Sequence, residues 1–133
     1  MTDHIARLPD QQPAWRVVPM PSGANQNGDI FGGWIMAQVD IAGATVAMRR
    51  ARGRVTTVAV DSFVFNQPVS VGDVVSFFAR VVATGRTSIK VSVEVFAERH
   101  PEQPITVKVT EATLSYVAIN QQGIKRLLPP SEL

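Results

Sequence analysis

The sequence predicts an α+β domain in which one central helix packs on a β-sheet. Its 133 residues suit a single hydrophobic core. The stretch 31–47 repeats apolar residues at helical spacing, whereas most of the chain after residue 54 has the composition and alternation of long strands. Because the chain has so few helices, the sheet must bury its inner face on this helix, which is the arrangement of an α+β domain.

The part before the helix is predicted to be irregular around one short strand. Residues 1–13 are polar and contain two prolines, so we expect a flexible arm. A short strand is expected at 15–20. The next nine residues, PSGANQNGD, resist regular structure because Pro, Gly and Asn favour turns. Asp29 ends this stretch, and its side chain can cap the helix by accepting a hydrogen bond from a helix N–H.

The helix is predicted from Phe31 to Ala47 and is apolar nearly all round. Such a helix is buried on most of its faces. Three glycines lower its helix propensity by roughly 1 kcal/mol each relative to alanine. They are Gly32, Gly33 and Gly43. Glycines at such positions usually let another group approach the backbone closely. A basic cluster followed by Gly53 indicates where the helix ends. The cluster consists of Arg49, Arg50 and Arg52.

Four long strands follow the helix. They are predicted at 55–65, 73–84, 89–97 and 105–119. The third alternates cleanly except at Phe96, and the apolar face of the last changes near Thr110, which indicates a β-bulge. The outer face of the sheet still carries Val and Phe side chains, so we expect the sheets to associate in an oligomer. The domain is therefore expected at 14–120, between the arm and a C-terminal tail at 121–133.

Composition excludes several classes of protein and site. With 45% hydrophobic and 18% charged residues, the chain is foldable and not disordered. The absence of cysteine excludes disulfides, thiolate metal sites and cysteine nucleophiles. His4 and His100 lie too far apart in the sequence to indicate a metal site.

The charge and hydropathy of the chain argue against nucleic-acid binding, a membrane span and a signal peptide. A net charge of +2 is too small to indicate nucleic-acid binding. No run approaches the roughly 18 apolar residues that would span a bilayer. The first fifteen residues have no signal-peptide core, so we expect a cytoplasmic protein without membrane contact.

Asp40 is the only charged residue between Phe31 and Ala47. Burying an unpaired carboxylate costs several kcal/mol, so Asp40 must be paired, protonated or beside a solvent-filled cleft. One interpretation is a general base or nucleophile at a cleft. The other is a structural carboxylate satisfied by a helix N-terminus or an arginine. The chemistry of this residue alone leaves both interpretations open.

The loop before the helix favours the catalytic interpretation. Asn25 and Asn27 offer amide donors, and Gly32-Gly33 leaves the N–H groups of the first helical turn uncovered by side chains. A helix N-terminus of this kind stabilises a developing oxyanion. Donor loop and carboxylate together suit attack on a carbonyl. Ordinary turn chemistry is the alternative role for the two asparagines.

Two further segments carry polar groups within β structure. Asp61 lies in an otherwise apolar strand, either as a second carboxylate of the site or as a group that holds loop backbone or an arginine. GRTSIK (85–90) combines a turn, hydroxyls and two cations, which suits a phosphate group but also suits a plain hairpin turn. No serine lies in a G-x-S-x-G elbow. GDIFGG matches neither the dinucleotide fingerprint nor the P-loop.

Three blocks, NQNGDIFGGWIMAQVDIAGA, RVTTVAVDSFVFNQPVSVGDVV and GRTSIKVSVEV, together resemble the hotdog-fold acyl-CoA thioesterases, most closely the small bacterial YciA-type acyl-CoA hydrolases. The resemblance extends from about Met20 to about Ile119. It implies a hotdog fold, in which a curved antiparallel sheet wraps a long central helix. It also implies dimers joined sheet edge to sheet edge, and a homohexamer built as a trimer of dimers.

The resemblance implies roles for individual residues. Asp40 takes the place of the catalytic aspartate, and Asn25 that of its partner, which a second subunit supplies. The N–H of Gly33, with Gly32 beside it, is implied to polarise the thioester carbonyl. The turn residues implied to contact coenzyme A are Arg86, Thr87 and Ser88. The resemblance does not fix the role of Asp61, which we keep as a candidate substrate-binding residue.

The sequence therefore predicts an enzyme that hydrolyses acyl-CoA to a free carboxylic acid and coenzyme A, without a metal or further cofactor. Asp40 would act as general base or as nucleophile. One rival is a non-catalytic acyl-CoA-binding or sensing module with the same cleft. Another is a hotdog dehydratase or hydratase, but that chemistry usually needs a histidine, and neither His4 nor His100 is well placed. Lys125 and Arg126 in the tail are further candidates for phosphate contacts.

Overall fold

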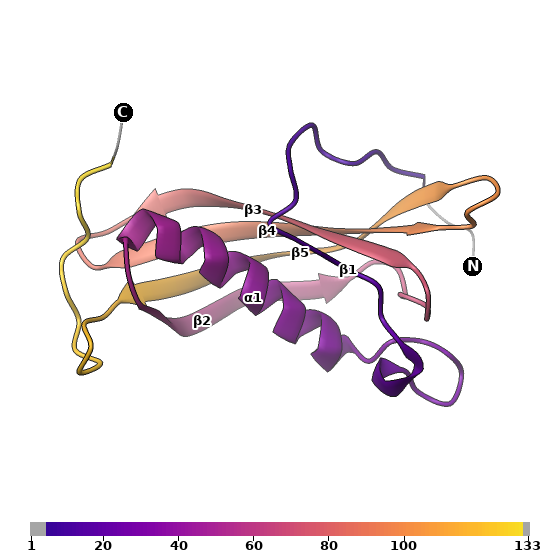
Figure 1. Cartoon of the computed structure of the whole chain (residues 1–133), viewed down its shortest axis with the longest axis horizontal. Helices are drawn as coiled ribbons and strands as arrows, with labels where there is room; N and C mark the ends of the chain where they lie inside the picture. The colour runs from indigo at the N-terminus through magenta and orange to yellow at the C-terminus, as the bar shows by residue number, and fades with distance from the viewer. Residues whose placement is uncertain (1–4, 132–133) are drawn as a thin grey trace.

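The computed structural model describes residues 5–131 and contains one long helix on a five-stranded antiparallel sheet (Figure 1). In chain order the elements are β1 (Trp15–Val17), the short 3-10 helix η1 (Pro21–Gly23), α1 (Gly32–Ala51), β2 (Val55–Phe65), β3 (Val74–Thr84), β4 (Ser88–Arg99) and β5 (Ile105–Ala118). The strands lie in the order β1-β3-β4-β5-β2, so β1 and β2 are the edges. Helix α1 runs along one face of the curved sheet, which confirms the predicted α+β architecture (Figure 1).

The long strands match their predicted ranges to within two residues at each end. Only β1 is clearly shorter than predicted, because it ends at Val17 and not at Met20. Pro19 explains the difference, since proline has no N–H to donate to a neighbouring strand.

The start of α1 differs from the sequence prediction. Its N-cap is Phe31, which has an extended backbone and makes no capping hydrogen bond with its side chain. Asp29 instead forms an isolated backbone bridge with Ser70, and two residues separate it from Gly32, the first helical residue. Because a cap must lie directly beside the first turn, the prediction that Asp29 caps the helix was wrong.

The helix ends at Ala51, four residues beyond its predicted end. Arg52, and not Gly53, takes the left-handed conformation, with φ 52°, and donates its backbone N–H to the carbonyl of Met48. The tail supplies a second cap, because the Arg126 guanidinium donates to the Ala51 carbonyl at 2.7 Å. The basic cluster therefore does mark the end of the helix, and the tail is attached there.

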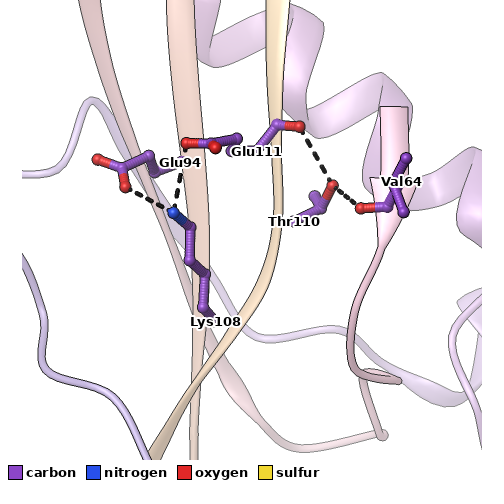
Figure 2. A network of polar contacts seen from close by, with 5 residues as sticks. All are labelled: Val64, Glu94, Lys108, Thr110 and Glu111. Carbon is purple, nitrogen blue, oxygen red and sulfur yellow. Dashed lines mark hydrogen bonds and ion pairs between the residues drawn. The ribbon is translucent and has the colours of Figure 1, made fainter. Parts of the chain in front are cut away.

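The predicted bulge near Thr110 is present in β5. Val95 of β4 pairs with Thr110 and Phe96 pairs with Lys108, so Val109 is an extra residue. The Thr110 hydroxyl donates a hydrogen bond to the carbonyl of Val64 in β2 (Figure 2). This bond links the edge strand β2 to β5 beside the bulge. On the outer face, Figure 2 shows the Lys108 ammonium between two carboxylates, 3.0 Å from Glu94 and 3.3 Å from Glu111.

Helix α1 buries only one of its faces within a single chain. The core joins five of its residues to inward side chains of β3, β4 and β5. Those helix residues are Ile35, Val39, Ala42, Ala47 and Ala51. The opposite face leaves Met36, Ile41 and Met48 between 42% and 46% exposed. The predicted burial of the helix on most faces is therefore not reached by one chain alone.

The edge strand β2 is the second apolar feature left uncovered. Val58, Val60 and Val64 are exposed along its 11 residues. Within residues 5–131, its backbone pairs with β5 on one side and with no other strand. A long, apolar edge strand of this kind is a template for pairing with another chain.

Candidate functional site

The carboxylate of Asp40 lies in the middle of α1 and is held by two hydroxyl groups. The Thr57 hydroxyl of β2 donates to Asp40 Oδ1 at 2.8 Å. The Tyr116 hydroxyl of β5 lies 3.0 Å from the same oxygen and 3.0 Å from the Asp40 backbone carbonyl. Among residues 5–131, no partner contacts Asp40 Oδ2. The carboxylate is therefore oriented through one oxygen while the other remains available.

The hydrogen-bond partners of Asp40 bear on whether it is a catalytic or a structural carboxylate. Within residues 5–131, neither an arginine nor a helix N-terminus of the same chain contacts it, so its partners here are of neither kind named in the structural alternative. Both partners are neutral hydroxyl donors. Hydrogen bonds from neutral donors orient a carboxylate without cancelling its charge. Asp40 is only half-buried, so its unbonded oxygen can meet solvent or a ligand.

Gly43 explains how Tyr116 comes so close to the helix. The Tyr116 side chain is fully buried on β5, and its hydroxyl occupies the space that a Cβ at Gly43 would need. Asp40 lies about one helical turn before Gly43, on the same face of the helix. A side chain at Gly43 would therefore push the Tyr116 hydroxyl away from Asp40. The close approach predicted from the glycine therefore occurs at Gly43, with Tyr116 as the approaching group.

The setting of Tyr116 changes its acid–base behaviour. Burial, the nearby negative charge of Asp40 and the hydrogen bond to Asp40 all raise the pKa of the Tyr116 phenol. The phenol is thus a fixed hydrogen-bond donor to Asp40 and not a proton acceptor at ordinary pH.

This shift predicts a measurable alkaline behaviour, because Tyr116 is the only tyrosine in the chain. In the unfolded chain the phenol ionises near pH 10. The folded chain keeps that proton, so the free energy of unfolding falls as the pH rises above about 10. We expect no phenolate absorbance up to about pH 11 while circular dichroism reports a folded protein. Tyr116→Phe should weaken this pH dependence. A phenolate midpoint near pH 10 in the folded protein would contradict the assignment.

The loop before α1 is a tight turn organised by Asn25. Its side-chain oxygen accepts hydrogen bonds from the N–H groups of Asn27 at 2.8 Å and Asp29 at 3.2 Å. Gly28 completes the turn with a φ of 83°, in the region that favours glycine. The oxygen of Asn25 thus performs ordinary turn chemistry. Its Nδ2 amide has no hydrogen-bond partner among the described residues.

The glycine pair leaves donors exposed at the helix N-terminus. Trp34 and Ile35 donate their N–H groups to Phe31, whereas those of Gly32 and Gly33 have no acceptor within residues 5–131. A Cβ at Gly33 would meet nothing within 4 Å, and one at Gly32 would meet the ring of Phe65. Beside them a pocket of about 300 Å³ is lined by mostly apolar residues, including Ile30, Ile35 and Phe65. Donors and an apolar pocket therefore adjoin one another.

The structure does not bring all the predicted site residues together in one chain. Gly33 precedes Asp40 by seven residues, roughly 10 Å along the helix axis. Asp61 pairs with Thr113, so alternation places it on the outer face of the sheet, away from Asp40. The predicted turn containing Arg86, Thr87 and Ser88 joins β3 to β4 near the C-terminal end of α1.

Sequence reasoning missed Thr57 and Tyr116. Both lie in strands, and their contact with Asp40 depends on how β2 and β5 are registered beneath the helix. No local motif marks them. Their hydroxyls are an indirect signal only, because polar groups on the inner face of a sheet need partners.

No group of three or more His, Cys, Asp or Glu side chains is placed to hold a metal ion within residues 5–131. His100 lies in the loop between β4 and β5, and His4 lies outside the described residues. Over the same range, no helix has both the length and the apolar character needed to cross a membrane.

Comparisons with known proteins agree on one family. The family model of the Thioesterase superfamily matches residues 27–103. The acyl-CoA thioester hydrolase YciA of Escherichia coli K12 is 47% identical over 116 residues, covering 86% of this chain and 88% of that protein. A hexameric hotdog-fold thioesterase of Campylobacter jejuni is 40% identical with a TM-score of 0.86, covering 90% of this chain and 91% of that one.

More distant solved structures include two single-residue variants of the acyl-CoA hydrolase from Staphylococcus aureus. Each is 26% identical with a TM-score of 0.78, covering 86% of this chain and 70% of that one. One variant replaces an aspartate by alanine, and the other replaces a threonine 17 positions further along.

Proposed function

This chain belongs to the Thioesterase superfamily and has the hotdog fold. We propose that it hydrolyses acyl-CoA and that Asp40 is the reactive carboxylate. The observation that carries the proposal is the geometry of this carboxylate. Thr57 and Tyr116 hold one oxygen of the half-buried Asp40 side chain, and the other oxygen is unbonded within residues 5–131. The activity itself is that of an acyl-CoA thioester hydrolase, in agreement with the named relatives.

Two routes are open to the unbonded oxygen of Asp40. As general base, it takes a proton from water while the water oxygen bonds to the acyl carbon. The carbon–sulfur bond then breaks, and coenzyme A leaves as a thiolate that takes up the proton. As nucleophile, the carboxylate itself attacks the acyl carbon, the carbon–sulfur bond breaks and coenzyme A leaves as a thiolate, which gives an acyl anhydride. Water then hydrolyses the anhydride to the carboxylic acid and free Asp40, and the proton it releases goes to the thiolate. Both routes release a carboxylic acid and coenzyme A without a further cofactor.

The carbonyl oxygen needs donors that Asp40 does not supply. Such donors are available at the loop and helix N-terminus, from Asn25 Nδ2 and the N–H of Gly33, with Gly32 beside it. Because roughly 10 Å of helix separates Gly33 from Asp40, the two do not reach one carbonyl directly within a chain. We therefore infer that the donors come from a second copy of the chain.

Self-association also accounts for the surfaces left uncovered. Asp40 belongs to α1 and contacts Thr57 of β2, so the element with the exposed apolar face and the apolar edge strand meet at this residue. Pairing of two β2 edges would bury both surfaces and complete the sheet hydrogen bonds. The C. jejuni thioesterase is hexameric, and we propose the same assembly here, as a trimer of dimers.

Thr57 is the proposed positioning residue for the carboxylate. It follows Asp40 by 17 residues, the same separation as that of the two residues replaced in the S. aureus hydrolase. Thr57→Val keeps the shape and removes the hydrogen bond to Asp40. We expect kcat to fall roughly 10- to 100-fold with a smaller change in KM, because the misplaced group acts on the chemical step. Thr57→Ser, which restores a hydroxyl, should recover most of the loss.

Release of free thiol from acyl-CoA tests the proposal directly. We expect thiol release from a series of acyl-CoA chain lengths, with no metal or cofactor added. The pocket beside Gly32 is the proposed site of the acyl group. The turn at Arg86, Thr87 and Ser88, and Asp61 from a neighbouring copy, are the proposed contacts for coenzyme A. Binding of coenzyme A without thiol release for any chain length would instead support a non-catalytic sensing module.

A further inference from the structure

Gln67, just after the end of β2, is a buried polar residue that the hydrolysis described above does not use. It is 4% exposed, and its Oε1 atom is buried without a hydrogen-bond partner within residues 5–131. Leaving a buried acceptor unbonded costs free energy, and an apolar side chain of the same shape would avoid that cost. The stability of the chain therefore does not explain a glutamine at this position.

Gln67 lies between two cavities, which share it and Asn66 in their walls. The first is the proposed acyl pocket beside Gly32, with a volume of about 300 Å³ and mostly apolar walls. The second, which we call the outer cavity, has a volume of about 420 Å³. Its other lining residues are Ile5, Ala6 and Lys108. The acyl pocket and the outer cavity therefore adjoin one another at residues 66–67.

The outer cavity lies where β5 changes its neighbour along one edge. The N–H of Asn66, which follows β2, donates to the carbonyl of Val109 at 2.8 Å. The N–H of Ala6 in the N-terminal arm donates to the carbonyl of Thr106 at 2.7 Å. Because β4 occupies the opposite edge of β5 at these residues, the arm and the end of β2 follow one another along the same edge. The sheet is interrupted between them, beside Gln67.

The backbone around Gln67 is fixed, whereas its side chain is not. On one side Asn66 is bonded to Val109, and on the other the Pro68 carbonyl accepts from the Arg99 guanidinium at 3.0 Å. Pro68 also restricts the backbone of Gln67 to extended conformations. A substitution at this position therefore changes the barrier between the two cavities and leaves the segment that carries it in place.

We propose that Gln67 is a specificity-determining residue, which ends the acyl pocket and so limits the length of the acyl chain. This inference rests on the proposed function, which places the acyl group in that pocket. A straight acyl chain that enters beside Gly32 is surrounded by apolar groups until it meets Gln67. Each buried methylene raises affinity about fourfold, whereas a longer chain gains nothing once the side chain of Gln67 blocks its path.

Thiol release from a series of straight-chain acyl-CoAs, from acetyl to palmitoyl, tests this role. In the wild type we expect kcat/KM to rise about fourfold for each methylene up to a limiting length and then to stop rising. Gln67→Ala opens the acyl pocket to the outer cavity, so the limit should move by at least about two methylenes. For a chain two methylenes beyond the wild-type limit, kcat/KM should rise at least about tenfold. Gln67→Met keeps the length of the side chain and should keep the wild-type limit.

A second substitution tests whether the added space is the outer cavity. Ala6→Trp places a large side chain in that cavity, from the arm. Combined with Gln67→Ala, it should return the limit to the wild-type length, and alone it should not move the limit. Gln103→Ala is the matched control, because Gln103 is exposed in the loop between β4 and β5 and lines neither cavity. It makes the same chemical change and should leave the whole profile unchanged.

The outcomes separate this inference from the proposed function. An unchanged limit in Gln67→Ala, with circular dichroism that matches the wild type, would overturn the role of Gln67. A shift that Ala6→Trp does not reverse would overturn the path into the outer cavity. If Gln67→Ala does not fold, Gln67→Ser also shortens the side chain and makes the same test. A wild type that releases thiol from no acyl-CoA would refute the hydrolysis, and calorimetric affinities over the same series would still decide the role of Gln67.

Discussion

Asp40→Asn should lower kcat/KM for acyl-CoA by about 10³-fold or more, the size expected when a reacting base or nucleophile is lost. Asparagine keeps the shape of the side chain, and its amide oxygen can still accept hydrogen bonds from Thr57 and Tyr116. The amide neither removes a proton from water nor attacks a thioester. Thiol release at saturating and subsaturating acyl-CoA measures the loss.

Two controls distinguish a loss of the chemical step from a loss of folding or of substrate binding. The dissociation constant for coenzyme A and the thermal unfolding midpoint of Asp40→Asn should match those of the wild type. A variant that retains activity within about tenfold of wild type would rule out Asp40 as the reacting group. A variant that loses folding or coenzyme A binding together with activity would show a structural carboxylate.

Two inactive variants should restore activity to one another when they share an oligomer. Asn25→Asp is suited to this experiment because its carboxylate can still accept the N–H groups of Asn27 and Asp29, while the Nδ2 donor is lost. If Asp40 and Asn25 come from different copies, a mixed dimer with Asp40→Asn contains one intact site and one doubly defective site. Random mixing then gives about one quarter of wild-type activity.

Co-expression with two different affinity tags, followed by tandem purification, isolates the mixed oligomers. Each variant purified alone should show the background rate. Mixing the two proteins without exchange of subunits should also stay at background, which controls for residual activity. Recovery only in the mixed oligomers supports a shared site. No recovery, with mixed oligomers verified by both tags, would place both groups in one chain and contradict the intersubunit arrangement.

Much of the fold followed from local patterns in the sequence. The single apolar helical stretch and the alternating residues of β4 predicted the two layers, and the change of apolar face near Thr110 predicted the bulge at Val109. These features could be predicted because side-chain periodicity of 3.6 or 2 is a property of each segment alone. The wrong capping role of Asp29 shows the limit. Asp29 pairs with Ser70, which lies 41 residues away in the chain, and the helix begins only at Gly32. The side chain of Asp29 is therefore not at the capping position.

The candidate site shows the same division. Asp40 could be identified as a candidate from the sequence, since it is the only charged residue in an apolar helix. Burying an unpaired carboxylate costs free energy, so a carboxylate at this position needs a specific role or partner. Its partners were not, since Thr57 and Tyr116 reach it only through the registers of β2 and β5. Likewise, no local pattern showed that the tail folds back to contact both Arg50 at the end of α1 and the backbone of Arg86 in the β3–β4 turn.

The sequence by itself therefore determined the helix, the long strands, the carboxylate and the glycine donors, all of which depend on neighbouring residues. Only the tertiary structure decided which hydroxyls orient Asp40, that Gly43 makes room for Tyr116, and that Asp61 faces away from Asp40. Strand register and helix placement are set by packing over the whole core. Contacts between distant segments are consequences of that packing, and no short stretch of sequence contains them.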